Sequence, residues 1–308
     1  MPDSPASPAV ADWMGDIHPD QLGFPLEIDR SLYTKDTGLT FKQTPSGPLK
    51  LDAYRPTNVG GAAVPLVVMM HGGGWHQGGR YQMGLSRWAG YLASSGLAVV
   101  SIDYRLAPDT QYPDSFCDCL DAIDWAVDHA SDLGADPERV GLWGDSAGGH
   151  LVLLTATSQT RPDFSGPRLR NGAERLRAVV AWYPPTDMVD IHASERRSHD
   201  GPSTTAERFI GCLPEADPAR WAEASPLEQA HAAMPPSLVL QGTRDLLVPH
   251  RHAVRFAERL DALGARHESH IVDGAPHGFD RVAPGEEARR LIERSRTFLL
   301  DALRDPES

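Results

Sequence analysis

The chain has 308 residues, 41% of them hydrophobic, which is enough for a substantial core around one sheet with insertions. Its 29 basic and 42 acidic side chains give a formal net charge of −13, which disfavours a nucleic-acid partner and predicts an acidic surface. No apolar run approaches the length that spans a bilayer, and three cysteines do not indicate a disulfide framework.

The N-terminal residues 1–8 (MPDSPASP) carry proline and acid where a secretory signal peptide needs basic residues followed by an apolar core. We therefore expect a frayed N-terminal tail, a cytoplasmic protein and no membrane partner. We interpret residues 1–40 as an N-terminal segment that can contribute to a cap over the main domain, residues 41–308.

Strand-like and helix-like segments alternate along the chain, the pattern of a mostly parallel sheet with helices on both faces. Strands are predicted at 49–54, 65–70, 97–102, 139–143, 177–182, 237–241 and 268–272. Helices are predicted near 84–95, 115–131, 147–158, 250–263 and 286–304.

The segment 186–225 differs from this pattern, because it is polar, rich in charge and proline, and has Phe209-Ile210 as its main apolar anchor. It falls between two predicted strands at the carboxyl side of the sheet. We interpret it as an insertion that lines the entrance to a site, with a surface loop as the alternative.

The run Gly144–Gly148 (GDSAG) lies where a predicted strand turns sharply into a predicted helix. A serine on such a turn needs small neighbours, and its hydroxyl projects above the sheet edge within reach of a substrate carbonyl. The helix N-terminus directs positive dipole toward an oxyanion that forms there. The pentapeptide alone is a weak signal, but its strand–turn–helix context predicts Ser146 as a nucleophile.

A second glycine-rich motif, His71–Trp75 (HGGGW), follows the apolar run 66–70. Three consecutive glycines carry an entropic cost. Either a flexible turn or the close approach of backbone N–H groups to a ligand oxygen explains them. Two motifs that complete one oxyanion hole, in this order and after separate strands, favour the second explanation.

With three further motifs, the chain resembles the hormone-sensitive-lipase-like carboxylesterases of the α/β-hydrolase superfamily. These motifs are residues 103–108 (DYRLAP), 242–245 (GTRD) with Val248-Pro249, and 275–279 (APHGF). The resemblance implies an α/β-hydrolase fold, with a mostly parallel central sheet, helices on both faces and a small cap contribution. Residues 41–308 would then form the catalytic domain, with the insertion near 186–225.

The resemblance also implies that the backbone N–H groups of Gly73, Gly74 and Ala147 form the oxyanion hole. His71 is expected to hold the glycine loop by hydrogen bonds rather than to touch substrate. We expect Trp75 to form a wall of the substrate pocket, with a cover over the sheet edge as the alternative.

The nucleophile needs a base, and the base needs a group that orients it. Of thirteen histidines, His277 stands out because it lies in a tight loop after the last predicted strand. In this class of hydrolases the chain order is serine, acid, histidine. Asp245 follows the strand 237–241 and fits that order, whereas Asp187 follows an earlier strand and is expected to brace a turn. We therefore predict a triad of Ser146, Asp245 and His277.

These residues predict a serine carboxylesterase that cleaves a small or medium acyl ester through a covalent acyl-enzyme, without metal or cofactor. An arylformamidase or other amidase, a lactonase, a deacetylase and a lyase that reuses the triad stay open as alternatives. Binding proteins that lost the triad form a different class, and the filled triad positions argue against it. The expected partner is a small, soluble ester, and a homodimer is left open.

Overall fold

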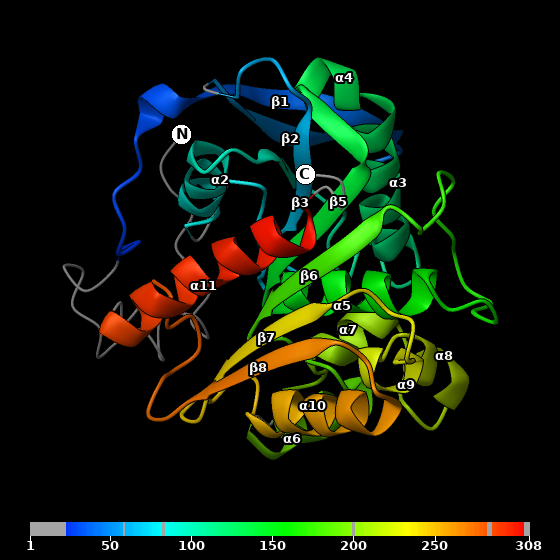
Figure 1. The fold of residues 1–308 in the computed structure, drawn as a ribbon. Coiled ribbons are helices and arrows are strands. Elements are labelled where there is room, and N and C mark those ends of the chain that lie inside the picture. Colours follow the sequence, from blue (N-terminus) through cyan, green and yellow to red (C-terminus); the bar gives the residue numbers. More distant parts are fainter. Residues whose placement is uncertain (1–22, 58, 82–83, 199–200, 282–284, 305–308) are drawn as a thin grey trace, which may run out of the picture.

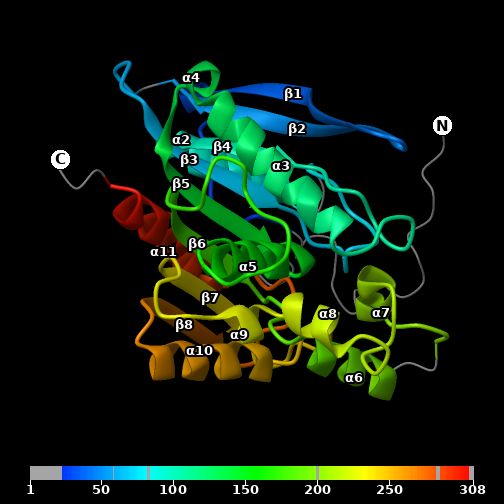
Figure 2. The same ribbon diagram turned by 90° about the vertical axis from the view of Figure 1, so that its right-hand side faces the viewer.

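An eight-stranded sheet with helices on both faces organises the chain (Figures 1 and 2). The computed structural model describes residues 23–304 apart from 58, 82–83, 199–200 and 282–284. The strand order is β1-β2-β4-β3-β5-β6-β7-β8. The pairs β1–β2 and β2–β4 are antiparallel, and every other neighbouring pair is parallel.

The strands are β1 (Tyr33–Thr44), β2 (Gly47–Pro56), β3 (Val64–Met70), β4 (Ala98–Ile102), β5 (Ala135–Asp145), β6 (Leu176–Trp182), β7 (Ser237–Gly242) and β8 (His267–Val272). The helices are η2 (Arg30–Leu32), α2 (Leu85–Ser94), α3 (Asp114–Asp128), α4 (Ala130–Leu133), α5 (Ala147–Gln159), α6 (Met188–Ser198), α7 (Thr205–Ile210), α8 (Pro218–Glu223), α9 (Pro226–Gln229), α10 (Arg251–Leu263) and α11 (Glu286–Ala302).

All seven predicted strands are present, and β1 is an eighth that the apolar pattern does not reveal. None of its twelve residues is buried, because it forms the sheet edge and pairs only with β2. The expected boundary at residue 40 falls within β1, so residues 33–40 belong to the sheet. Residues 1–22, which carry much of the expected cap segment, lie outside the described residues.

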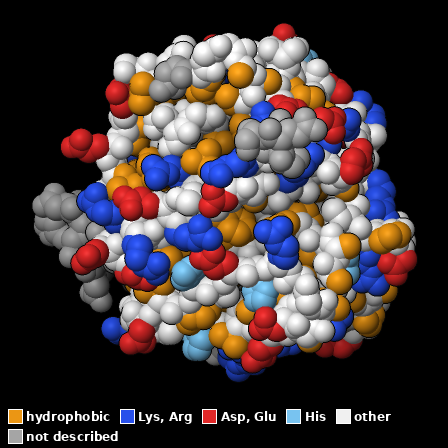
Figure 3. Space-filling model, in the orientation of Figure 1, with side chains coloured by type: hydrophobic (Ala, Val, Ile, Leu, Met, Phe, Trp, Pro, Cys, Tyr) orange, Lys and Arg blue, Asp and Glu red, His pale blue; other side chains and the backbone are white. Residues whose placement is uncertain are grey.

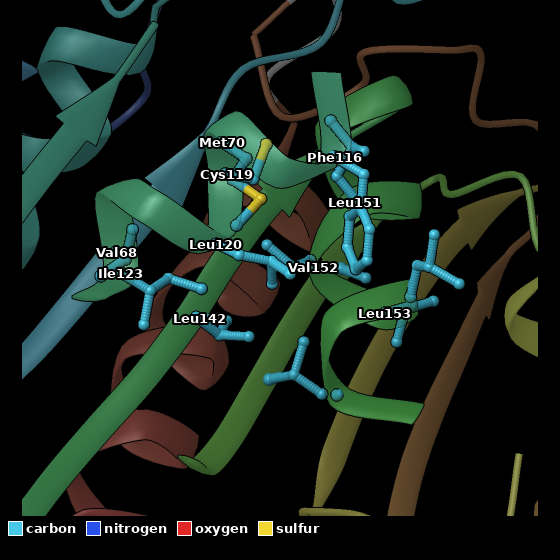
Figure 4. Packing of buried hydrophobic residues seen from close by; sticks show 14 of the residues in the cluster. Val68, Met70, Phe116, Cys119, Leu120, Ile123, Leu142, Leu151, Val152 and Leu153 are labelled. Atoms are coloured by element: carbon cyan, nitrogen blue, oxygen red, sulfur yellow. The ribbon is translucent and has the colours of Figure 1, made fainter. Parts of the chain in front are cut away.

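Two hydrophobic clusters lie on opposite faces of the sheet. Val67 and Met69 of β3 pack into the cluster that includes α2 and α11. Val68 and Met70 point to the other face, where α3, α5 and α10 contribute the packing (Figure 4). This alternation is the period of two expected for a strand with both faces covered. Every residue of α5 is buried, so the helix that follows the serine turn is enclosed on all sides.

The segment between β6 and β7 folds into the short helices α6, α7 and α8, which lie together in Figure 2, followed by α9. Helix α7 begins with a capping box, in which Thr204 and Glu207 satisfy each other's backbone N–H groups. The expected anchor Phe209-Ile210 is fully buried. Trp221 of α8 is a second buried anchor that the sequence analysis did not single out.

Acidic and basic side chains are interspersed on the face shown in Figure 3. The acidic excess of the sequence is therefore not gathered into a single block on that face. Among the described residues, no helix combines the length and the apolar composition needed to cross a membrane.

Candidate active site

The backbone at Ser146 makes the sharp strand-to-helix turn that the sequence predicts, and its positive φ is a strained conformation for a serine. Strand β5 ends at Asp145, α5 begins at Ala147, and Ser146 between them has φ 52° and ψ −120°. Its N–H donates to the Trp182 carbonyl at 2.8 Å, which ties the turn to β6. A Cβ on Gly148 would lie 2.0 Å from the Met70 carbonyl oxygen, so only glycine fits there. A non-glycine residue such as Ser146, held in a rarely populated backbone conformation by its surroundings, is typical of functional sites.

The three predicted triad residues form one chain of hydrogen bonds, although they come from three separate loops. His277 Nε2 lies 3.0 Å from Ser146 Oγ, and His277 Nδ1 lies 2.7 Å from Asp245 Oδ2. With the carboxylate accepting from Nδ1–H, Nε2 is left to accept the serine proton. This arrangement lets the imidazole act as a base toward the hydroxyl.

The Asp245 carboxylate is itself held firmly. Its Oδ1 accepts hydrogen bonds from the N–H groups of Leu247 (2.9 Å) and Val248 (2.8 Å), and its Oδ2 accepts one from Gln241 Nε2 (2.8 Å). The side chains of Asp245 and His277 are both buried. These contacts fix the direction from which the carboxylate approaches the imidazole.

The rival acid, Asp187, has a different role. Its Oδ1 accepts from the Asp190 N–H at 3.0 Å in the first turn of α6, and its Oδ2 pairs with Arg255 at 3.0 Å. It therefore braces the start of a helix, as the sequence analysis expects.

The segment His71–Trp75, here called the glycine strap, runs beside the serine turn. Gly73 has φ 116°, and a Cβ there would lie 2.0 Å from the Gln77 carbonyl oxygen. Gly72 N donates to Asp145 Oδ1 at 3.0 Å. Within the described part of the chain, the N–H groups of Gly73, Gly74 and Ala147 donate to no other residue. They are therefore available to a ligand oxygen.

His71 holds the strap from inside the protein, as predicted. Its ring stacks on Tyr104 with centroids 4.2 Å apart, and Nδ1 lies 2.7 Å from the Gly72 carbonyl. The Tyr104 hydroxyl donates to the His71 carbonyl at 2.9 Å. Burial lowers the pKa of His71, so the ring is neutral near pH 7.

Trp75 is buried between the strap and the insertion. It packs face-on against Phe209 of α7 at 4.9 Å, and its Nε1 donates to His150 Nδ1 at 3.1 Å. His150 Nε2 is 2.8 Å from the Ala224 carbonyl, and burial lowers the pKa of His150 to about 4. The neutral imidazole thus links the strap, α5 and the insertion. The role of Trp75 as a pocket wall stays a prediction.

Three further residues that sequence analysis missed lie beside the site: Tyr183, Asp280 and Arg281. Tyr183 follows β6, and its ring centroid is 4.5 Å from that of His277. Asp280 and Arg281 follow the histidine on the same loop, and Arg281 donates to Asp145. No sequence motif relates these three residues to one another. They come into contact only because three loops meet in the folded protein.

Comparison with known protein families identifies the family of this chain. The profile of the BD-FAE family matches residues 51–260, which is more than half of the sequence. The chain belongs to the BD-FAE family.

Relatives of this BD-FAE chain carry esterase names. It is 32% identical over 261 residues to "Esterase LipC" of Mycobacterium tuberculosis, a match that covers 80% of this chain and 63% of that protein. It is 30% identical over 261 residues to the "Ethyl acetate hydrolase" of Pseudomonas putida, with 80% of this chain and 76% of that protein covered. The three first-ranked M. tuberculosis relatives are matched over only 52–63% of their own length.

A solved structure supports the same fold. The truncated form of a carbohydrate esterase from gut microbiota superposes with a TM-score of 0.75 at 23% identity, over 90% of this chain and 99% of that one. The predicted α/β-hydrolase fold is confirmed, and so is the resemblance to carboxylesterases of that superfamily.

Chelation provides a test of the prediction that this BD-FAE member needs no metal. Among the described residues, no three His, Cys, Asp or Glu side chains are grouped so that they could hold an ion. We expect turnover after dialysis against EDTA to match that of untreated protein. Loss of activity that returns on adding a divalent cation would contradict this expectation.

Proposed function

We propose that the protein is a serine carboxylesterase whose nucleophile, base and acid are Ser146, His277 and Asp245. The observation that carries the proposal is the continuous hydrogen-bonded chain from Ser146 Oγ through His277 to a buried carboxylate. The esterase names of the relatives support the same chemistry.

In the first half of the reaction, Ser146 Oγ attacks the acyl carbon of the ester while His277 Nε2 takes the hydroxyl proton. The carbonyl oxygen becomes an oxyanion that accepts hydrogen bonds from the N–H groups of Gly73, Gly74 and Ala147. The tetrahedral intermediate then collapses, and Nε2–H protonates the departing alkoxide. This step leaves the acyl group on Ser146.

In the second half, a water molecule repeats the attack on the acyl-enzyme with His277 as its base. The acid product leaves, and Ser146 recovers its proton from Nε2. Every proton therefore moves between a single nitrogen, His277 Nε2, and the serine, the substrate or water, and Asp245 keeps the imidazole in the required tautomer. The balance needs no redox partner and no cofactor.

We propose a small or medium acyl ester as the substrate, with Trp75 as a wall of its pocket. The name of the P. putida relative, an ethyl acetate hydrolase, supports a short acyl group. Amide, lactone and elimination chemistry are not favoured by the names of the relatives. A cytoplasmic location stays a prediction, which cell fractionation tests. Sedimentation shows whether the protein forms a homodimer.

A substrate panel tests the proposal. Nitrophenyl esters from acetate to dodecanoate are compared with a formyl-anilide and an aryl lactone, under one set of conditions. We expect kcat/KM to be highest among the short and medium esters and lower for the anilide and the lactone. A clear preference for the formyl-anilide would replace the esterase assignment with an amidase.

Covalent labelling tests the nucleophile without a choice of substrate. A fluorophosphonate is expected to add one label per chain, on the peptide that contains Ser146, because that hydroxyl is hydrogen-bonded to His277 Nε2. Peptide mass spectrometry locates the label, and Ser146→Ala protein serves as the control. A label on another serine, or none on protein that hydrolyses esters, would refute the assignment.

A further inference from the structure

A buried cluster of charges lies directly behind the serine turn. The Nη2 atom of Arg281 donates to the Asp145 carboxylate and, at 2.7 Å, to the Tyr183 hydroxyl. The Tyr183 hydroxyl in turn donates to Asp280 Oδ1 at 2.7 Å, and Arg281 Nε lies 3.7 Å from the same oxygen. The side chains of Arg281 and Asp145 are only 11% and 2% exposed. Solvent therefore screens this cluster weakly.

Asp145 connects the cluster to the reacting groups. It immediately precedes Ser146, and its Oδ1 accepts the Gly72 N–H at 3.0 Å. A Cβ on Gly72 would lie 2.8 Å from Asp145 Oδ2, so the strap and the carboxylate are in direct contact. The position of this one carboxylate thus couples the serine turn to the glycines that follow Gly72.

A buried carboxylate at this place carries an electrostatic cost. Its negative charge would oppose an oxyanion forming beside Gly73 and Gly74. It would also favour the protonated imidazole of His277, which cannot take a proton from the serine. A guanidinium bonded to the same carboxylate offsets both effects. A buried charge that loses its partner is strongly unfavourable.

We propose that Arg281 is a positioning residue of the reaction, which holds Asp145 against the glycine strap and compensates its charge. The inference rests on the proposed serine-esterase function, because the charge matters only if an oxyanion forms at the strap. Arg281 contacts Asp145 rather than substrate, so it acts through the turn and the strap.

Charged and titratable groups reach the His277 region from several elements. Asp245 comes from the loop after β7, Tyr183 from the loop after β6, and Asp145 from the serine turn. His71 lies on the strap, where burial keeps it neutral, and Asp280 and Arg281 share the histidine's own loop. Burial raises the pKa of Asp280. Arg281 is the cation among these groups that binds Asp145.

The experiment compares three variants: Arg281→Gln, Arg281→Lys, and the double variant Arg281→Gln with Asp145→Asn. For Arg281→Gln we expect kcat on 4-nitrophenyl acetate to fall about tenfold or more. The acidic limb of kcat/KM should move to higher pH by about one unit, the scale of an uncompensated nearby charge. Arg281→Lys should keep the limb near its parental position.

The double variant separates charge from packing. It has the same formal charge as the parental cluster, and the amide oxygen that Asp145→Asn introduces can still accept the Gly72 N–H. We expect it to restore the parental pH limb and to recover most of the lost kcat, although it contains one more substitution. A purely structural role predicts the opposite order, with the double variant the worst.

The matched control is Arg105→Gln, which breaks another largely buried ion pair, Arg105 Nε to Asp118 Oδ2 at 2.7 Å. It should lower Tm without moving the pH limb. The proposal is overturned if folded Arg281→Gln matches this control, or if the double variant is as slow as Arg281→Gln. The midpoint of the His277 titration, measured by NMR in the parent and in each variant, makes the same comparison without a measurement of turnover. Parent protein that neither hydrolyses esters nor takes a fluorophosphonate would instead refute the proposed function.

Discussion

Replacing Ser146 by alanine is expected to lower kcat by about 10⁶-fold, the scale found when the serine of a triad is removed in another serine hydrolase. The variant loses the hydroxyl that lies 3.0 Å from His277 Nε2. The Gly73, Gly74 and Ala147 N–H groups remain, so a small rate above the uncatalysed one is expected to persist. Hydrolysis of 4-nitrophenyl butyrate by purified parent and variant measures the loss.

The fold should survive this change, because alanine keeps the Cβ and the same backbone strain at φ 52°. We expect Tm and the circular dichroism spectrum to match the parent closely. Ser295→Ala is the matched control: it removes the hydroxyl of a buried serine that bonds the Leu291 carbonyl within α11 and contacts no triad residue. It should keep parental turnover. Activity of Ser146→Ala within tenfold of the parent would reject Ser146 as the nucleophile.

Sequence patterns predict the inner strands β3 to β7 well because these strands are largely buried on both faces. Runs such as 65–70 and 237–241 are continuously apolar or nearly so, and the structure places them in β3 and β7. The same reasoning fails at β1, where an edge position leaves every residue at least partly exposed. A strand without an apolar pattern is recognised only through its pairing with β2, which is a tertiary contact.

The predicted site residues share a local signature, whereas the missed ones do not. Ser146 and His277 lie in tight turns whose glycines are required by close backbone contacts or by positive φ. Asp245 follows a buried strand in the order expected for this class. Arg281 has no such signature, because its proposed role depends on the carboxylate to which its guanidinium donates in the folded protein. That partner, Asp145, is 136 residues away in the chain.

The insertion between β6 and β7 also has one feature that the sequence predicts and one that it does not. Its apolar anchor at Phe209 is visible in a polar stretch, and the residue is indeed buried. Its contact with Trp75 of the strap is not visible, because side-chain packing between distant segments leaves no periodic trace. The sequence therefore predicts that this segment is anchored, but not what it is anchored to.

Replacing Asp245 by asparagine is expected to lower kcat by about 10⁴-fold, the loss known for the equivalent change in a serine protease. The amide can donate to His277 Nδ1, which would stabilise the tautomer that carries its proton on Nε2. That tautomer cannot accept the Ser146 proton. The carboxylate that favours the imidazolium is also lost, so the acidic limb of kcat/KM should move to lower pH.

Asp187→Asn is the matched control, because it makes the same chemical change in the rival acid. Its amide oxygen can still accept the Asp190 N–H, while the ion pair with Arg255 is lost. We expect a small decrease in Tm, with kcat and the pH limb close to parental values. Profiles of kcat/KM against pH for the parent and both variants decide between the two acids. If Asp187→Asn loses most of its kcat/KM while Asp245→Asn keeps nearly the parental value, the role of acid passes to Asp187. The serine and histidine assignments would stand.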